Sequence, residues 1–480
     1  MLFSYLPLAF LLLKLMNSQQ GSKSYIFGIT LVATIGGLLF GYDTAVISGA
    51  VDSLKTFFHL DAATFGDAAT FYHGATVSSA LIGCIIGSAI SGLFASYLGR
   101  KKSLFIAALL FLVASLGAAY PESIFFPNGD GSLRVLVAFN IYRILGGIGV
   151  GLASAICPMY IAEIAPAEIR GKLVSWNQFA LIFGMLIVYF VNYFIANGKP
   201  QTWVDTQGWR LMFASNAVPA GLFGLLLFMV PETPRYLALT GKEDKALNIL
   251  SKINGTIKAK EILSDIKETA HEKVEKVLAY GWTVLIIGIL LSVFQQIVGI
   301  NVVLYYAPTI FKGLGFGNDA AMWQTVIMGF INIIFTLVAI FTVDKFGRKP
   351  LLIIGSTGMA IGMFAIGLLA FLNIIGVSTL IFIVIYTASF MMSWGPICWV
   401  LISEIFPNTI RGKAVAIAVA AQWISNFIVS STFPALQSIS MTFTYCLYGV
   451  MSVLSALFVW KMVPETKGKT LEDMTKLWKK

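Results

Sequence analysis

The chain has 480 residues, of which 58% are hydrophobic and only 12% are charged. Soluble proteins carry about 45–50% apolar and about 25% charged residues, so this composition excludes a soluble enzyme, a disordered chain and a nucleic-acid-binding module. The net charge of +10 comes from short basic clusters between apolar runs. That pattern is typical of loops at the cytoplasmic face of a membrane protein.

Apolar stretches long enough to cross a bilayer, about 20 residues each, recur along the whole chain. Charged residues, Pro or Gly separate them. Four cysteines lie singly in apolar runs and three histidines are scattered, so we expect no disulfide, no metal site and no cofactor. The sequence predicts an all-α membrane protein with twelve transmembrane helices, over residues 25–51, 72–97, 102–120, 133–157, 173–196, 210–230, 282–311, 320–343, 350–372, 377–403, 412–434 and 440–462.

The distribution of Lys and Arg predicts the orientation. Breaks after even-numbered spans carry clusters such as residues 100–102 and 345–349, whereas breaks after odd-numbered spans hold only isolated basic residues. Because positive residues stay on the cytoplasmic side, we expect both termini in the cytoplasm and a multi-pass protein of the cell (inner) membrane. Residues 1–15 are too short to span and lack the basic start of a signal peptide, so Met16 is the expected native start.

One long polar stretch divides the chain. Residues 231–281 have mixed charges three or four apart, which favours short amphipathic helices on the cytoplasmic face. We therefore expect an N-terminal segment, a six-helix half, a linker, a second six-helix half and a cytoplasmic tail. Their boundaries are 1–24, 25–230, 231–281, 282–463 and 464–480.

The two predicted halves repeat each other. Three motif pairs recur in the same order: 98–101 (LGRK) with 346–349 (FGRK), 160–166 (YIAEIAP) with 401–407 (LISEIFP), and 231–233 (PET) with 464–466 (PET). Their offsets are 248, 241 and 233 residues. Two parallel halves with a site between them at mid-membrane is a transporter architecture.

These motifs resemble those of the sugar porters of the major facilitator superfamily. Further segments that carry the resemblance are GYDT at 41–44, YRILGG at 142–147, PETPR at 231–235, QQIVGIN at 295–301 and PETKG at 464–468. The resemblance covers about residues 16–475 and implies the two-half major facilitator fold. Within the family, the chain is most similar to bacterial carriers that couple D-xylose to protons.

Asp43 and Arg143 are the charges that lie well inside predicted spans. A charge at this depth costs at least about 2.5–3.5 kcal/mol, so it normally faces the bundle interior and has a partner. A static ion pair that orients the first and fourth spans is one interpretation. The other is a carboxylate that takes up and releases a proton, and the family resemblance favours it, since passive facilitators have a neutral residue at the position of Asp43.

A sugar site needs uncharged groups that donate and accept hydrogen bonds, together with aromatic faces. Amide side chains meet the first need, and span seven offers Gln295, Gln296 and Asn301. Residues 295 and 301 lie on different faces of a regular helix, but a break near Gly299 could bring them together. An isolated Gln could equally bind a neighbouring helix, and an aromatic residue could simply face lipid.

The resemblance implies roles for particular residues. Sugar-contacting side chains would be Gln178, Gln295, Gln296, Asn301, Trp399 and Gln422, and lining side chains would be Phe40, Tyr305 and Trp423. Trp399 follows Gly395 and Pro396, where we expect a kink. Met185 departs from the xylose carriers, which have a Gln near the sugar there.

Paired Arg and Glu residues at the predicted cytoplasmic ends suggest a gate. Positive loops explain isolated basic residues, but not the repeated Glu163 and Glu404. Arg–carboxylate pairs are geometrically specific, so we expect latches that close the inner face. The set is Arg100, Glu163 and Arg170 in one half and Arg348, Glu404 and Arg411 in the other.

The sequence therefore predicts a sugar:proton symporter. Its expected partners are a D-xylose-like monosaccharide, protons and the lipid bilayer; we expect no nucleic acid and a monomeric chain. A passive sugar facilitator and a sugar sensor are the alternatives. A membrane enzyme is disfavoured because no acidic cluster or nucleotide-phosphate loop is present.

Overall fold

A computed structural model describes residues 22–123, 131–166, 169–269, 276–313, 315–374, 376–467 and 476–478. The expected start at Met16 lies outside these residues. Helices make up the fold, and the described residues include no strand. Twelve helical segments are long and apolar enough to cross a membrane, which confirms the predicted all-α architecture.

The first six spans come from helices that begin at Lys23. They are α2 (Lys23–Val46), α5 (Ala69–Tyr97), α6 (Arg100–Ala119), α7 (Leu133–Ile164), α8 (Arg170–Ala196), and α10 (Trp209–Ser215) continued by α11 (Ala217–Leu227). Short elements connect the first span to the second and the fifth to the sixth. The first connection contains η1 (Ile47–Gly49), α3 (Val51–Phe57), α4 (Ala62–Phe65) and η2 (Gly66–Ala68), and the other contains α9 (Gln201–Trp203) and η3 (Val204–Gly208).

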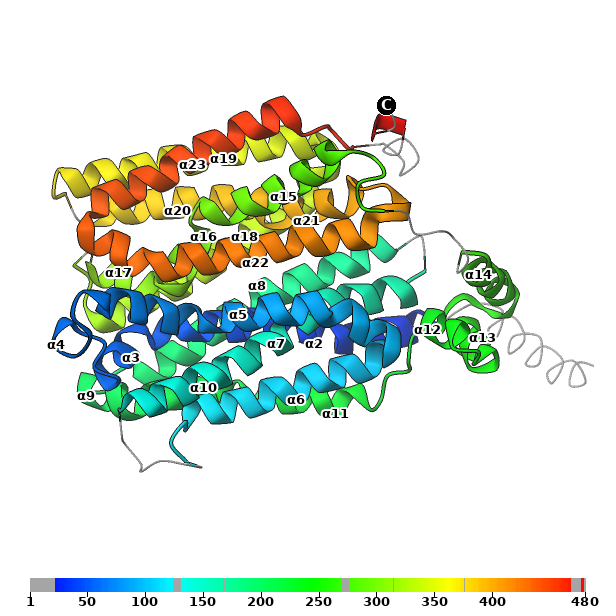
Figure 1. Cartoon of the computed structure of the whole chain (residues 1–480), viewed down its shortest axis with the longest axis horizontal. Helices are drawn as coiled ribbons and strands as arrows, with labels where there is room; N and C mark the ends of the chain where they lie inside the picture. Colours follow the sequence, from blue (N-terminus) through cyan, green and yellow to red (C-terminus); the bar gives the residue numbers. More distant parts are fainter. Residues whose placement is uncertain are drawn as a thin grey trace, which may run out of the picture.

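The last six spans form the second half of the bundle (Figure 1). They are α15 (Trp282–Ile297) with α16 (Ile300–Tyr305), α18 (Asn318–Phe346), α19 (Arg348–Phe371), α20 (Val377–Met391) with α21 (Trp394–Glu404), α22 (Asn408–Ile439) and α23 (Met441–Met462); the short α17 (Ala307–Gly313) follows α16. In Figure 1 the two halves lie one above the other, with their helices running in roughly the same direction.

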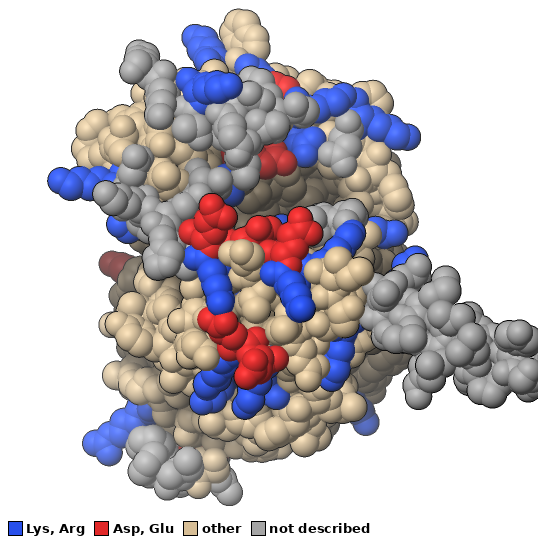
Figure 2. All heavy atoms as spheres, turned by 90° about the vertical axis from the view of Figure 1, so that its right-hand side faces the viewer, with Lys and Arg blue, Asp and Glu red and all other residues tan. Residues whose placement is uncertain are grey.

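Three short helices, α12 (Pro234–Leu239), α13 (Glu243–Asn254) and α14 (Thr256–Thr269), connect the halves at one end of the bundle (Figure 1). We call this end the linker side and the opposite end, where α3, α4 and α17 lie, the far side. Figure 2 looks onto the linker side, where acidic and basic side chains gather and a recess opens between the halves.

Glycines allow the helices to pack backbone against backbone. A Cβ atom on Gly41 of α2 would lie 1.9 Å from the carbonyl oxygen of Leu181 on α8, and one on Gly147 of α7 would lie 1.8 Å from that of Ala80 on α5. Small residues permit such approaches in membranes, where packing rather than the hydrophobic effect drives helix association. Large apolar side chains on the outside, such as Phe341, remain exposed, as expected for a surface that faces lipid.

The two halves contact each other on the far side. Lys312 of α17 forms an ion pair with Asp52 of α3 at 2.7 Å, and the Thr309 hydroxyl donates to the other carboxylate oxygen at 3.0 Å. Gly74 of α5 packs directly against the carbonyl of Ser431 on α22. The far side is therefore closed in this conformation, while the recess of Figure 2 lies on the linker side.

The break in span ten differs from the expectation. The helix is interrupted at Met392 and Ser393, before Gly395 rather than at the Gly395–Pro396 pair. Pro396 instead occupies the first turn of α21. At that position its missing N–H costs little, because the first N–H groups of a helix have no intrahelical partner.

Candidate functional site

A buried ion pair of the first half joins the predicted proton-coupling residues Asp43 and Arg143. Asp43 of α2 and Arg143 of α7 are 2% and 3% exposed. The guanidinium Nη1 lies 3.4 Å from both carboxylate oxygens, and Nη2 donates to the Asp43 carbonyl at 3.5 Å. The predicted pair is therefore in contact, although its separation is long for a charge-assisted hydrogen bond.

Asn216 is the closest partner of the Asp43 carboxylate. It lies where α10 meets α11, is buried, and donates from Nδ2 to Asp43 Oδ1 at 2.9 Å. Asn216 is not among the residues that the sequence predicted for the proton site. An Asn within an otherwise apolar span was the available signal, since such amides are costly in membranes unless they are paired.

Arg143 is held from the other side by an aromatic ring. Its guanidinium carbon lies 5.2 Å from the centre of the Phe213 ring, a distance typical of a cation–π contact. Its Nε atom is buried without a hydrogen-bond partner among the described residues. The Asp43 carboxylate thus has two kinds of partner, a neutral amide at 2.9 Å and a cation at 3.4 Å.

Four amide side chains form one hydrogen-bonded chain in the second half. Gln295 Nε2 donates to the Trp394 carbonyl at 3.0 Å, and its Oε1 accepts from Gln296 Nε2 at 3.1 Å and from Gln422 Nε2. Asn301 Nδ2 donates to Gln296 Oε1. The structure therefore brings together the amides of spans seven and eleven that the sequence predicted as sugar ligands.

A helix break at Gly299 makes this arrangement possible. Gly299 has φ +93°, between α15 and α16, in the left-handed region that glycine adopts at little cost. Because the helix breaks there, the Asn301 side chain reaches Gln296 and donates a hydrogen bond to it. The predicted unwinding of span seven is confirmed.

Aromatic rings border the amide chain. The rings of Phe40 on α2 and Trp423 on α22 lie 5.6 Å apart, so this contact joins the two halves. Tyr305 is buried, and its hydroxyl accepts from Asn426 at 3.3 Å. Gln422 Oε1 and Trp423 Nε1 are buried without a partner among the described residues. An unpaired acceptor and an unpaired donor on neighbouring residues can each pair with a hydroxyl group of a ligand.

Two predicted sugar ligands form no hydrogen bond with the amide chain in the described part of the structure. Gln178 of α8 and Trp399 of α21 are half-buried, and no hydrogen bond within the described residues joins either of them to the four amides. A further buried tryptophan of this region is Trp394, whose indole Nε1 donates to Ser356 Oγ at 2.7 Å. Sequence reasoning missed Trp394 because its contribution to the amide chain is a main-chain carbonyl.

The Arg and Glu residues at the linker side pair within each half. Arg100 Nη2 lies 2.6 Å from Glu163 Oε1, and Arg348 Nη2 lies 3.1 Å from Glu404 Oε1. Arg411 donates to the Phe406 carbonyl at 3.2 Å, and Arg170 is exposed at the start of α8. In this conformation, with the far side closed, the pairs join helices of one half rather than the two halves.

The repeated PET motifs bind the starts of α6 and α19. Glu232 accepts from the backbone N–H of Arg100 at 3.0 Å, and Glu465 accepts from those of Arg348 and Lys349 at 3.0 and 2.9 Å. Partial burial raises the pKa of Glu465, but these N–H donors, with those of Lys467 and Thr466, outweigh it and hold the pKa below its usual value. Each carboxylate thus neutralises the partial positive charge of a helix N-terminus.

No group of three or more His, Cys, Asp or Glu side chains in the described part of the chain is placed to hold a metal ion. The chemistry available at the site is hydrogen bonding through neutral amides and aromatics, together with one buried carboxylate. That combination can bind a polyhydroxyl compound and a proton at separate places.

The chain is similar to known sugar carriers over nearly its whole length. The chain is 56% identical over 479 residues to the D-xylose-proton symporter of Escherichia coli (strain K12), covering 96% of this chain and 97% of that protein. It is 38% identical to the glucose facilitated diffusion protein of Zymomonas mobilis, covering 96% and 99%. The inward open structure of the xylose transporter XylE from E. coli superposes with a TM-score of 0.85 at 54% identity, covering 95% of this chain and 100% of that one.

The family model for "Sugar (and other) transporter" matches residues 29–478, nearly the whole described chain. The match includes both halves, the buried carboxylate and the amide chain. With its twelve spans and two six-helix halves, this multi-pass membrane protein belongs to the sugar transporter family of the major facilitator superfamily.

Proposed function

We propose that the chain imports D-xylose or a related pentose or hexose together with protons, by alternating access. The observation that carries this proposal is the Asp43 carboxylate, buried at the centre of the first half and bound by Asn216 and Arg143. A passive carrier has no need of such a group, because a buried charge is costly and persists in membranes where it serves a pathway or a relay.

The sugar would bind along the amide chain between the halves. Gln295, Gln296, Asn301 and Gln422 offer both donors and acceptors, and the Phe40 and Trp423 rings offer apolar faces for the C–H groups. Gln178 and Trp399 would join the site when the halves close around the sugar. Because α2 carries both Phe40 and Asp43, a sugar against Phe40 and a proton on Asp43 act on the same helix.

Coupling then follows from the partners of Asp43. Protonation removes the negative charge that attracts Arg143, which frees α2 from α7 at that point. The loaded carrier can rock, and release of the proton on the other side restores the pair. This cycle gives the carboxylate a changing environment in the two orientations, which a static ion pair would lack.

The linker side would be cytoplasmic, as its basic clusters suggest, with both termini inside, in the inner membrane, and the chain acting as a monomer. The closed far side, held by Asp52 and Lys312, would then be the outer gate. In the opposite orientation the set Arg100, Glu163, Arg170, Arg348, Glu404 and Arg411 would close the inner face. Re-pairing of these residues across the halves is part of the proposal.

Uptake by purified protein in liposomes tests the function. We expect D-xylose to accumulate above its equilibrium level when the outside is acidic, and to equilibrate only when an ionophore collapses the gradient. A facilitator would fill the liposomes equally fast with and without the gradient. Labelled D-glucose, L-arabinose and D-xylose measured side by side would identify the substrate, since Met185 lies buried in α8, where the resembling xylose carriers have a Gln.

A further inference from the structure

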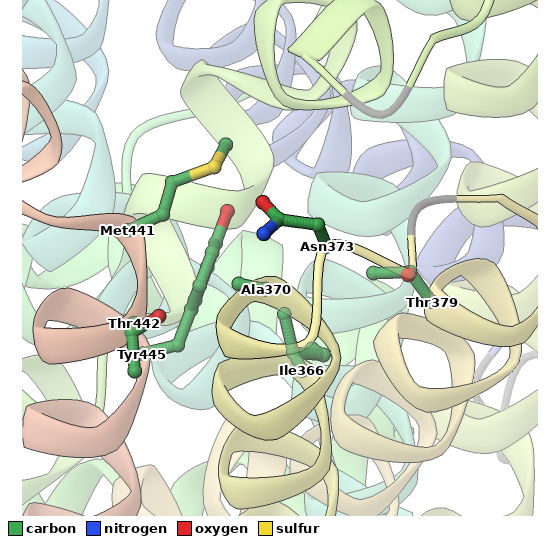
Figure 3. A pocket seen from close by; sticks show the side chains of 7 residues that line it. All are labelled: Ile366, Ala370, Asn373, Thr379, Met441, Thr442 and Tyr445. Carbon is green, nitrogen blue, oxygen red and sulfur yellow. The ribbon is translucent and has the colours of Figure 1, made fainter.

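A second cavity lies at the far side of the second half, away from the amide chain. It has a volume of about 230 Å³ and lies between the far-side ends of α19, α20 and α23 (Figure 3). Its lining residues are Ile366, Ala370, Asn373, Thr379, Met441, Thr442 and Tyr445. None of them belongs to the proposed sugar or proton site.

The internal repeat relates the lining of this cavity to residues at the far-side ends of the first half, where Glu122 follows the end of α6 and Trp209 begins α10. The offset of 248 that relates Arg100 to Arg348 also relates Glu122 to Ala370. The offset of 233 between the PET motifs relates Trp209 to Thr442. Two large side chains of the first half are thus replaced by small ones in the second.

In the first half these larger side chains are fully packed. Trp209 is 0% exposed, and Glu122 forms an ion pair with Arg210 at 2.8 Å. The Arg210 guanidinium also lies over the Trp209 ring at 4.5 Å. The residue at the Arg210 offset in the second half is Phe443, which is exposed. The cavity is therefore a difference between the two copies, and the packing of the first half shows that the fold can close this space.

The polar groups of the cavity are uncharged and partly unsatisfied. The Tyr445 side chain is 3% exposed, and its hydroxyl is buried without a partner among the described residues. In Figure 3 this hydroxyl and the Asn373 amide point to the same end of the cavity. A buried hydroxyl without a partner costs about 1–3 kcal/mol, so a bound acceptor would stabilise this region. No charged side chain lines the cavity, so a neutral acceptor fits it better than an ion, which would lie there without a counter-charge.

The rim of the cavity is apolar and exposed. Leu372 and Ile374 flank Asn373, and Phe443 follows Thr442; each of the three is at least half exposed. Exposed residues of this kind at the end of a span face lipid acyl chains. The cavity thus combines hydrogen-bond donors, one of them on the exposed Asn373, with exposed hydrocarbon on the residues next to its lining.

We propose that this cavity binds a phospholipid of the far-side leaflet, with the glycerol–ester region inside and the acyl chains over the apolar rim. Ester carbonyls are neutral acceptors. The Tyr445 hydroxyl, the Asn373 amide and the Thr442 hydroxyl can each donate a hydrogen bond to them. The lipid's charged headgroup remains at the water interface, which is consistent with a lining that carries no counter-charge.

Photo-labelling tests this site with full-length protein in liposomes. The probe is a phosphatidylcholine with a diazirine next to its glycerol ester, and labelled peptides are mapped by mass spectrometry. Thr442→Trp restores the side chain found in the first half and should fill the cavity. Leu368→Trp adds the same side chain to α19 at an exposed position and is the matched control. Tyr445→Phe removes only the unpaired hydroxyl and preserves the packing.

We expect label in the segments 366–379 and 441–445 of the unaltered chain. Label there should fall about tenfold in Thr442→Trp, equivalent to about 1.4 kcal/mol, fall less in Tyr445→Phe, and stay unchanged in Leu368→Trp, with D-xylose uptake intact in all three. Equal labelling of all variants would show ordinary boundary lipid and overturn the proposal. Displacement of the label by free D-xylose would also overturn it, by assigning the cavity to a sugar.

Discussion

The amide of Asn216 lies 2.9 Å from Asp43 Oδ1, closer than the 3.4 Å that separates this carboxylate from the Arg143 guanidinium. The buried carboxylate is therefore positioned by a neutral donor as well as by a cation. Because Asn216 lies at the junction of α10 and α11, three separate spans meet at Asp43. A proton on this group would alter contacts to all three.

Asp43→Asn should abolish proton-driven accumulation of sugar but preserve the exchange of sugar across the membrane. The amide keeps the size of the side chain but cannot bind and release a proton, so the accumulation ratio in liposomes with an acidic exterior should fall to about one. Counterflow of labelled D-xylose should continue. Asp67→Asn, an exposed far-side carboxylate of the same half, is the control and should accumulate normally. Undiminished accumulation by the Asp43 variant would refute the coupling role.

Asn216→Ala should move the pH profile of uptake. The amide donates to the ionised carboxylate, so its loss destabilises the charged form and makes protonation easier. A hydrogen bond to a charged group contributes about 1.5–3 kcal/mol, and 1.36 kcal/mol corresponds to one pH unit. We expect the midpoint of the acid limb to move to higher pH by about one unit. A profile that overlays the unaltered one would remove Asn216 from the proton site.

Gln295→Ala should weaken sugar binding without unfolding the chain. The substitution removes the side chain that links Trp394, Gln296 and Gln422, leaving buried partners unpaired at about 1–3 kcal/mol. Isothermal titration with D-xylose should give a dissociation constant raised by about tenfold or more. Gln207→Ala, at an exposed position, should bind normally. Equal affinities for the two variants, with equal yields, would count against this site.

Gly299→Ala should destabilise the protein and the site together. Alanine is strained at φ +93°, and its Cβ would lie 2.8 Å from the Tyr448 ring. We expect a loss of about 1–3 kcal/mol, seen as a lower melting temperature and weaker sugar binding. Gly221→Ala is the matched control, since nothing lies within 4 Å of its Cβ position. Equal melting temperatures would show that the break at Gly299 is not required.

Glu465→Gln should destabilise the fold at neutral pH but not in acid. The pKa of Glu465 is lowered in the folded state, so its contribution is present above its unfolded value and is lost as the pH falls through the folded one. The melting temperature of the variant should be lower at pH 7 and should converge with that of the unaltered chain below about pH 4. A difference that persists in acid would indicate a steric effect instead.

Much of the architecture follows from the sequence, because a bilayer imposes a length and a composition on every span. The sequence shows twelve apolar segments, the repeated GRK and PET motifs and the basic loops. The buried Asp43 and Arg143 were identifiable for the same reason, since a charge within an apolar span stands out. Their contact is confirmed by the 3.4 Å separation.

The partners of these residues depended on how the helices pack. A regular helix would have separated Gln295 from Asn301, and the left-handed Gly299 is what returns Asn301 to Gln296. Nothing in the sequence around Asn216 indicates that it pairs with Asp43. Trp394 binds Gln295 through its main-chain carbonyl, a group that every residue has. The sequence by itself determined the number of spans, the duplication and the presence of the buried charges, because local composition is sufficient for these. Only the tertiary structure decided which side chains meet, because contacts between spans depend on helix breaks and on close approach at glycines.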